Sequence, residues 1–123
     1  MSALATLREL QGRRGEAESL HRDVLAKRER VRGTEHPQVA ETANKLAGIC
    51  CHDGRYAEAE AFYRRALAIR EKTFGPDHVF VAEPLEGLAK VCEQTGRAAE
   101  AQELSARVAR IREKAAQAAG EPG

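Results

Sequence analysis

The sequence predicts an all-α fold, a solenoid in which helical hairpins stack side by side. Two observations lead to this class. The sequence matches itself at a shift of 42 residues, and each matching unit holds two apolar patterns of helical period separated by a glycine. A period of about 20–50 residues is the signature of repeat architectures, whose units bury their apolar faces only against one another.

The glycine-centred motif of the unit occurs three times. It reads GRRGEAE at residues 12–18, GRYAEAE at 54–60 and GRAAEAQ at 96–102. The other half of the unit also matches, because a Val-Ala-Glu run at residues 39–41 returns at 81–83. We therefore expect one domain over residues 1–118 and a flexible tail at 119–123. The three repeats are expected at about 1–33, 34–75 and 76–118.

Each repeat is expected to contain two helices, which gives six antiparallel helices in all. The first is predicted at Ser2–Gln11, shorter than its counterparts, and the second repeat should hold helices at about Pro37–Cys51 and Arg55–Phe74. In the first helix of that repeat, helical spacing places the apolar side chains on one face. They are Val39, Ala43, Leu46, Ala47 and Cys50.

Glycines are expected to end these helices, because glycine adopts the left-handed conformation of a helix C-terminus without strain. The first helix of each pair would end at Gly12, Gly54 and Gly96, and the second at Gly33 and Gly75. Pro84 lies inside a predicted helix, where it removes a backbone donor. It either shapes the surface of that helix or marks a local irregularity.

Composition excludes several classes of function. The 20 basic and 19 acidic side chains nearly cancel, so the basic footprint of a nucleic-acid-binding protein is missing. No stretch resembles a membrane span or an export signal. The three cysteines include no CxxC pair, which argues against disulfides and structural zinc and favours reduced thiols in the cytoplasm.

No catalytic, cofactor-binding or metal site is predicted. His36 and His78 recur one repeat apart at helix starts, and we expect each to bond to the local backbone, because no neighbouring carboxylate or thiol has a metal-ligand spacing. Cys51 and His52 are adjacent, but consecutive helical side chains point about 100° apart and do not form a catalytic pair. We expect a protein without enzymatic activity and without cofactors.

The sequence resembles the tetratricopeptide repeats of kinesin light chains. The resemblance is carried by GRYAEAEAFYRRALAIREK at 54–72 and by the turn Gly75-Pro76-Asp77-His78, and it covers about residues 3–114. It implies a right-handed superhelix whose first helices line a concave groove that binds a peptide or a partner protein. Catalysis is not implied.

Carried over residue by residue, the resemblance implies a groove lined by Thr6, Glu9, Glu41, Asn44, Lys45, Gly48, Cys51, His52, Glu83, Glu86, Lys90 and Glu93. Of these, Asn44 keeps the peptide-contacting asparagine of kinesin light chains. Glutamate outnumbers lysine in the set, so we expect neutral or basic partners.

A second hypothesis is a regulatory or self-assembly segment of a larger signalling system. Repeat arrays normally end in a polar capping element, yet the last predicted helix carries Ala101, Leu104, Val108 and Ile111. Apolar edges exposed at the two ends would favour a homodimer or a neighbouring domain. Enzymatic activity is expected only from a fused domain outside this chain, and RNA binding is disfavoured by the charge balance and the few aromatic residues.

Overall fold

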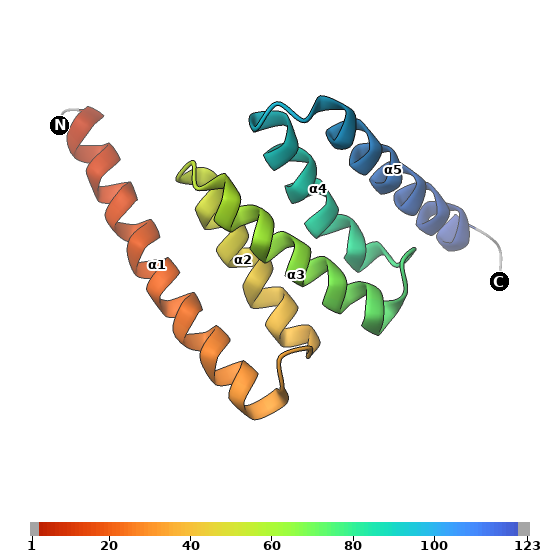
Figure 1. The fold of residues 1–123 in the computed structure, drawn as a ribbon, viewed down its shortest axis with the longest axis horizontal. Coiled ribbons are helices and arrows are strands. Elements are labelled where there is room, and N and C mark those ends of the chain that lie inside the picture. The colour runs from red at the N-terminus through yellow and green to blue at the C-terminus, as the bar shows by residue number, and fades with distance from the viewer. Residues whose placement is uncertain (1–2, 121–123) are drawn as a thin grey trace.

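The structure, a computed structural model, describes the backbone of residues 3–120 and the side chains of residues 12–118. This part of the chain forms five α-helices (Figure 1), namely α1 (Ala3–Arg32), α2 (Pro37–His52), α3 (Tyr56–Phe74), α4 (Val79–Gln94) and α5 (Ala98–Gly120). The predicted all-α class is confirmed. None of these helices is both long and apolar enough to span a bilayer.

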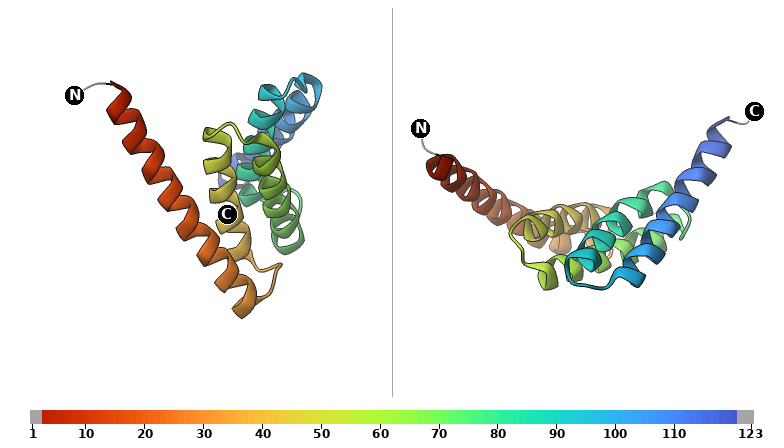
Figure 2. Two further views of the ribbon diagram at one scale, coloured as in Figure 1. Left: turned by 60° about the vertical axis from the view of Figure 1, so that its left-hand side comes forward. Right: turned by 90° about the horizontal axis from the view of Figure 1, so that it is seen from above.

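The helices form a bent row of antiparallel neighbours. α2 packs between α1 and α3, α4 packs between α3 and α5, and α2 also touches α4. Seen from above in Figure 2, the row curves so that α2 and α4 lie on its inner side and α3 on its outer side, while the N-terminal half of α1 extends away from the other helices. The inner side of α2 and α4 is therefore a concave surface.

The predicted break at Gly12 is wrong, and so is the separate helix at Ser2–Gln11. α1 continues from Ala3 to Arg32, so the described chain has five helices in place of six. Gly54 and Gly96 do adopt the left-handed conformation, with φ of 78° and 80°, and Gly12 does not.

The residue before each glycine explains this difference. Asp53 and Thr95 cap the ends of α2 and α4, and the Thr95 hydroxyl donates to the Val91 carbonyl at 2.8 Å. Aspartate and threonine compete with helical backbone bonds, whereas glutamine, which stands at position 11, is a good helix former. α1 therefore runs through Gly12 at a cost of about 1 kcal/mol relative to alanine.

The predicted apolar face of α2 forms the centre of the core. All five of its side chains are fully buried. They divide between one cluster with α1 and α3, around Leu25, and a second with α3 and α4, around Tyr63. A third cluster joins α4 to α5. Because α2, α3 and α4 each contribute to two clusters, the core is continuous along the row.

The last helix does not present the apolar edge that the sequence led us to expect. Ala101, Val108 and Ile111 are 3%, 5% and 2% exposed, and Leu104 is partly buried against the core. Antiparallel packing on α4 covers these side chains within the chain itself. The large apolar side chains most exposed in the described part are instead Leu20 and Val31 of α1, at 65% and 80%.

Tyr63 of α3 packs between the two inner helices. Its side chain is 8% exposed, and burial raises the pKa of its hydroxyl to about 12. The ring covers Gly87 of α4 so closely that a Cβ built there would lie 2.2 Å from Cζ of Tyr63. At Gly48 of α2, a Cβ would lie 3.8 Å from the Tyr63 hydroxyl, an ordinary contact.

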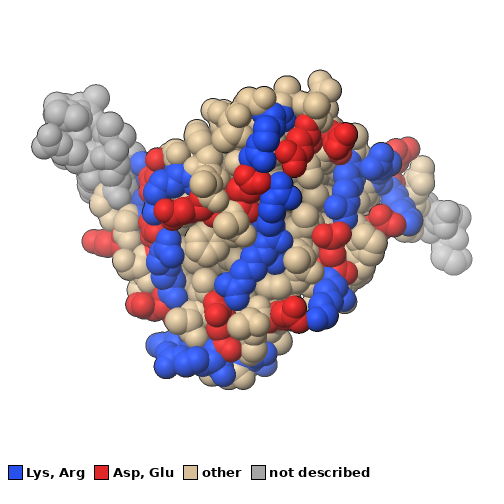
Figure 3. Space-filling model, in the orientation of Figure 1, with Lys and Arg blue, Asp and Glu red and all other residues tan. Residues whose placement is uncertain are grey.

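Charged side chains form rows on the face that Figure 3 shows, where basic and acidic groups alternate. Arg55 binds Glu18 through two nitrogens, at 2.5 and 3.2 Å. One repeat later, Arg97 binds Glu60 in the same way, at 2.6 and 3.1 Å. The pairs span 37 residues in sequence and join consecutive repeats.

A second row of ion pairs follows the same register. Arg65 binds Glu29 at 3.1 Å and also donates to the Thr34 carbonyl at 3.4 Å. Its counterpart Arg107 binds Glu71 at 2.8 Å and the Pro76 carbonyl at 3.1 Å. We call both rows together the charge ladder. It accounts for many of the i,i+42 identities in the sequence.

Two glycine substitutions should separate packing from helix propensity. We expect Gly48→Ala to raise the free energy of unfolding by up to about 1 kcal/mol, because alanine favours the helix and the space exists. Gly87→Ala should lower it by about 1–3 kcal/mol through overpacking against Tyr63. Urea unfolding followed by circular dichroism measures both. Equal effects of the two changes would contradict this packing, and Tyr63→Leu should relieve the loss caused by Gly87→Ala.

The charge ladder should make stability depend on pH. Hydrogen bonds from Arg97 and Arg64 lower the pKa of Glu60 from its ordinary 4.5 to about 2 in the folded protein. The unfolded chain then binds the proton more readily, so stability present above pH 4.5 is lost as the pH falls toward 2. Urea unfolding at several pH values should show a weaker dependence for Glu60→Gln than for the native protein. The control Glu103→Gln, at an exposed glutamate of α5, should keep the native dependence.

Candidate functional site: the concave surface of α2 and α4

The predicted groove residues in the described part of the chain all lie on the two inner helices. Glu41, Lys45 and His52 of α2 and Glu83, Lys90 and Glu93 of α4 are exposed, whereas Asn44, Gly48, Cys51 and Glu86 are partly buried. The side chains of Thr6 and Glu9 lie outside the described residues. We call the concave surface of α2 and α4 the groove.

A hydrogen bond crosses the floor of the groove. The Asn44 amide nitrogen donates to a carboxylate oxygen of Glu83, and this bond joins α2 to α4. The other carboxylate oxygen of Glu83 lies 3.9 Å from a guanidinium nitrogen of Arg70 on α3. Lys45 and Glu41 form an i,i+4 ion pair at 3.3 Å along α2. The Asn44 side chain is therefore already bonded to a residue of its own chain. The resemblance to kinesin light chains alone did not indicate this bond.

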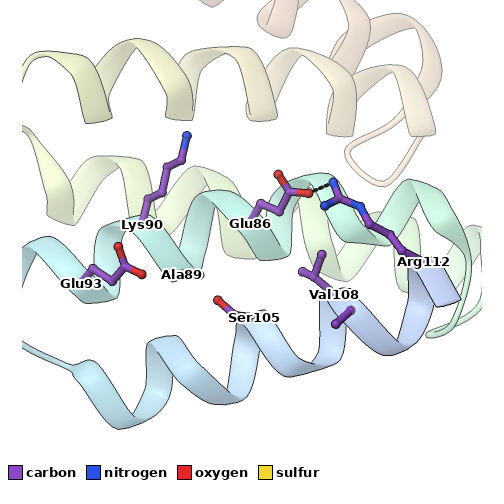
Figure 4. Close-up of a pocket in the computed structure, with 8 residues that line it drawn as sticks. Glu86, Ala89, Lys90, Glu93, Ser105, Val108 and Arg112 are labelled. Carbon is purple, nitrogen blue, oxygen red and sulfur yellow. Dashed lines mark ion pairs between the residues drawn. The ribbon is translucent and has the colours of Figure 1, made fainter.

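At one end of the groove, α5 contributes a residue that the sequence analysis missed. Arg112 reaches from α5 to the carboxylate of Glu86 on α4, as Figure 4 shows. Together they border a cleft of about 380 Å³ between the two helices, which is also lined by Lys90, Glu93 and Ser105. Arg112 partly offsets the acidic character expected from glutamates and lysines alone.

At the other end, a cleft of about 300 Å³ lies between the start of α2, the end of α3 and the start of α4. Its lining combines carboxylates and aromatic rings: Pro37, Gln38, Glu41, Arg70, Phe74, Phe80 and Glu83. The aromatic rings escaped the sequence analysis, which concentrated on positions that repeat. The available signal was a departure from the repeat, because Phe74 and Phe80 align with Arg32 and Gln38.

Histidine caps begin both inner helices. Nδ1 of His36 accepts the backbone N–H of Gln38 at 3.1 Å, and Nδ1 of His78 accepts that of Phe80 at 3.1 Å. Each histidine thus satisfies one of the free donors in the first turn of its helix. The prediction that these histidines bond to the local backbone is confirmed.

Pro84 lies within α4, which continues past it. Proline has no N–H, so the Phe80 carbonyl lacks its usual helical donor. Arg70 replaces that donor with a guanidinium bond to the Phe80 oxygen at 3.0 Å. In the preceding repeat, Arg28 donates to the Gln38 carbonyl at the same distance. A repeated arginine therefore holds the first turn of each inner helix.

One group of side chains has the composition of a metal site. Ligand atoms of Glu18, Cys50 and Glu58 lie within 4.8 Å of one another. Both carboxylates are already engaged by Arg55 and Arg22, and burial raises the pKa of the Cys50 thiol, which disfavours the thiolate that metals bind. Glu18 belongs to the charge ladder, and we assign the group a structural role.

Comparisons with known proteins agree with this architecture. A family model described as tetratricopeptide repeat matches residues 38–114, and a second model with the same description matches residues 1–38. A search among curated proteins gave no match.

A double-mutant cycle can test whether Arg70 takes the place of the helical donor that Pro84 lacks. We expect Arg70→Met to lower the free energy of unfolding by about 1 kcal/mol, because the Phe80 carbonyl loses its protein donor. In a Pro84→Ala background, residue 84 regains an N–H. Arg70→Met should then lower the free energy of unfolding by less. Urea unfolding of the four proteins gives the coupling energy. Strictly additive effects would show that Arg70 does not compensate for the N–H that Pro84 lacks.

Proposed function

We propose that this chain, which belongs to the tetratricopeptide repeat family, is a non-catalytic scaffold. It binds a peptide or partner protein in the groove. Tetratricopeptide repeats generally act as protein–protein interaction modules. Stacked helical repeats form extended concave surfaces, and these suit such binding. The 42-residue unit supports the further proposal that the repeats are of the kinesin-light-chain kind.

The observation that carries this proposal is the contrast between the two faces of the inner helices. The core needs only their apolar sides, and the charge ladder joins α1, α3, α5 and the loops without them. Glu41, Lys45, Glu83, Lys90 and Glu93 are nevertheless exposed on these two helices. The core does not use these charged side chains, and their exposed parts are available to a partner.

The partner is proposed to be a neutral or basic protein segment. The excess of glutamate over lysine in the groove supports this, although Arg112 reduces the excess beside Glu86. Nucleic acid and membranes are not proposed as partners, since the net charge is +1. Three free cysteines support the proposal of a reducing, cytoplasmic location without cofactors.

Self-association is the second candidate, and one observation on α1 favours it. Leu20 aligns with Phe62 of α3, which packs against the core under α2. Because α1 is continuous, its own first segment does not cover the equivalent face, and Leu20 is 65% exposed. A second copy of the chain could cover this face. Sedimentation of the native protein over a range of concentrations would show a dimer if so, and a monomer at every concentration would oppose it.

Charge reversal tests the groove. We expect Glu41→Lys, Glu86→Lys and Glu93→Lys together to abolish retention of a partner protein that the immobilised native chain captures from lysate, because a basic segment is then repelled. The matched control reverses Asp23, Glu103 and Glu113, three exposed acidic residues outside the groove. Circular dichroism checks that both triple variants fold. Equal retention of the partner by the groove variant and the control would exclude the groove as its binding site.

A further inference from the structure

We propose that the end of the groove beside the α3–α4 turn is an anchoring subsite for a basic side chain of the partner. An arginine or lysine would pack its alkyl part against Phe80 and Phe74 and place its charged end beside Glu41 and Glu83. This inference rests on the proposed function and adds to it the chemistry of one contact. We call these four residues the anchor subsite.

The aromatic wall of the subsite is exposed and ordered by its own contacts. Phe80 is 53% exposed and Phe74 37%. Their ring centroids lie 5.2 Å apart, edge to face, and the His78 ring lies 4.9 Å from Phe74 and 4.7 Å from Phe80. Val79 between them is 46% exposed. Three neighbouring large apolar side chains thus meet solvent at one turn.

The fold does not require these aromatic side chains. At the equivalent turn of the preceding repeat, Arg32 and Gln38 occupy the positions of Phe74 and Phe80. Both turns have the same histidine cap and the same arginine bond to a carbonyl of the first turn. Because arginine and glutamine suffice at the equivalent turn, we assign the exposed faces of these rings to contact with another molecule.

Two carboxylates line the same cleft as these rings. The side chains of Glu41 and Glu83 are 50% and 65% exposed, whereas Arg70 beneath them is 12% exposed. Arg70 is also committed to the Phe80 carbonyl. The Arg70 guanidinium is therefore buried and already bonded. Glu41, paired with Lys45 at 3.3 Å, and Glu83, bonded to Asn44, keep half or more of their side chains exposed.

Aromatic rings facing carboxylates form a site for a cation on an apolar stem. A guanidinium or ammonium gains cation–π attraction from phenylalanine and Coulomb attraction from glutamate, and the methylene groups cover the rings. This chain contains an internal example, in which the Arg22 guanidinium lies 5.5 Å from the Phe62 ring centre. An acidic side chain would be repelled, and a purely apolar one would desolvate the carboxylates without compensation.

The subsite is also held in place before any partner binds. The backbone of Phe80 is fixed at its N–H by His78 and at its carbonyl by Arg70. Glu83 is fixed by Asn44. Few rotatable bonds are left to immobilise, which lowers the entropic cost of binding.

The experiment uses a library of short acetylated peptide amides of random sequence, selected on the immobilised full chain. We expect the selected peptides to carry arginine or lysine next to an apolar residue. Phe80→Gln, which installs the residue of the preceding turn, should weaken the best peptide at least about tenfold while circular dichroism stays native. Glu83→Gln should weaken it and reduce its salt dependence. Glu103→Gln, at an exposed glutamate of α5 outside the groove, should leave the affinity unchanged.

Each alternative result has a defined meaning. Selected peptides without a basic residue, or native affinity in Phe80→Gln, would overturn the anchor subsite. If those same peptides are released by the triple reversal of Glu41, Glu86 and Glu93, the groove stands and only the subsite falls. If the native chain selects no peptide at all, the subsite is wrong, and the proposed function is then judged by the partner capture alone.

Discussion

The structure depends on the burial of α2 and α4 between their neighbours. Each of these helices has an apolar face too wide for one partner, so it packs against helices of two consecutive repeats. In α2 this face is completely buried, with Leu46 in the cluster shared with α1 and α3 and Cys50 in the cluster shared with α3 and α4. A single hairpin would leave half of it in water. The row of hairpins, its curvature and the concave side all follow from this requirement.

The charge ladder adds register to that packing. A bidentate pair such as Arg97 with Glu60 is directional, and its repetition at Arg55 with Glu18 sets the same offset between consecutive repeats. Exposed ion pairs contribute little individually, about 0–1 kcal/mol each. The members of the charge ladder, which recur every 42 positions, therefore describe the scaffold. Residues that break the recurrence while exposed, such as Phe80, are where a specific function is to be sought.

Much of the fold could be predicted from the repeat. The ends of α2 and α3, the left-handed glycines at 54 and 96, the buried stripe of α2 and the capping role of His78 all depend on local spacing, which a sequence displays directly. The glycine motif alone did not predict the continuity of α1, because that continuity depends on Gln11, the residue before the motif. The burial of Ile111 was missed because a helix at the end of the chain was assumed to lack a partner for its apolar face.

By itself, the sequence determined the repeat and the pairing of helices, because periodicity and turn chemistry are local properties. Only the tertiary structure determined which side chains of different helices meet in the groove. It brought Arg112 to Glu86, Asn44 to Glu83, and Arg70 to the carbonyl that Pro84 leaves without a donor. It also brought Phe74 and Phe80 into one cleft with two carboxylates. These contacts join different helices, and their geometry arises from packing that no spacing along one helix encodes.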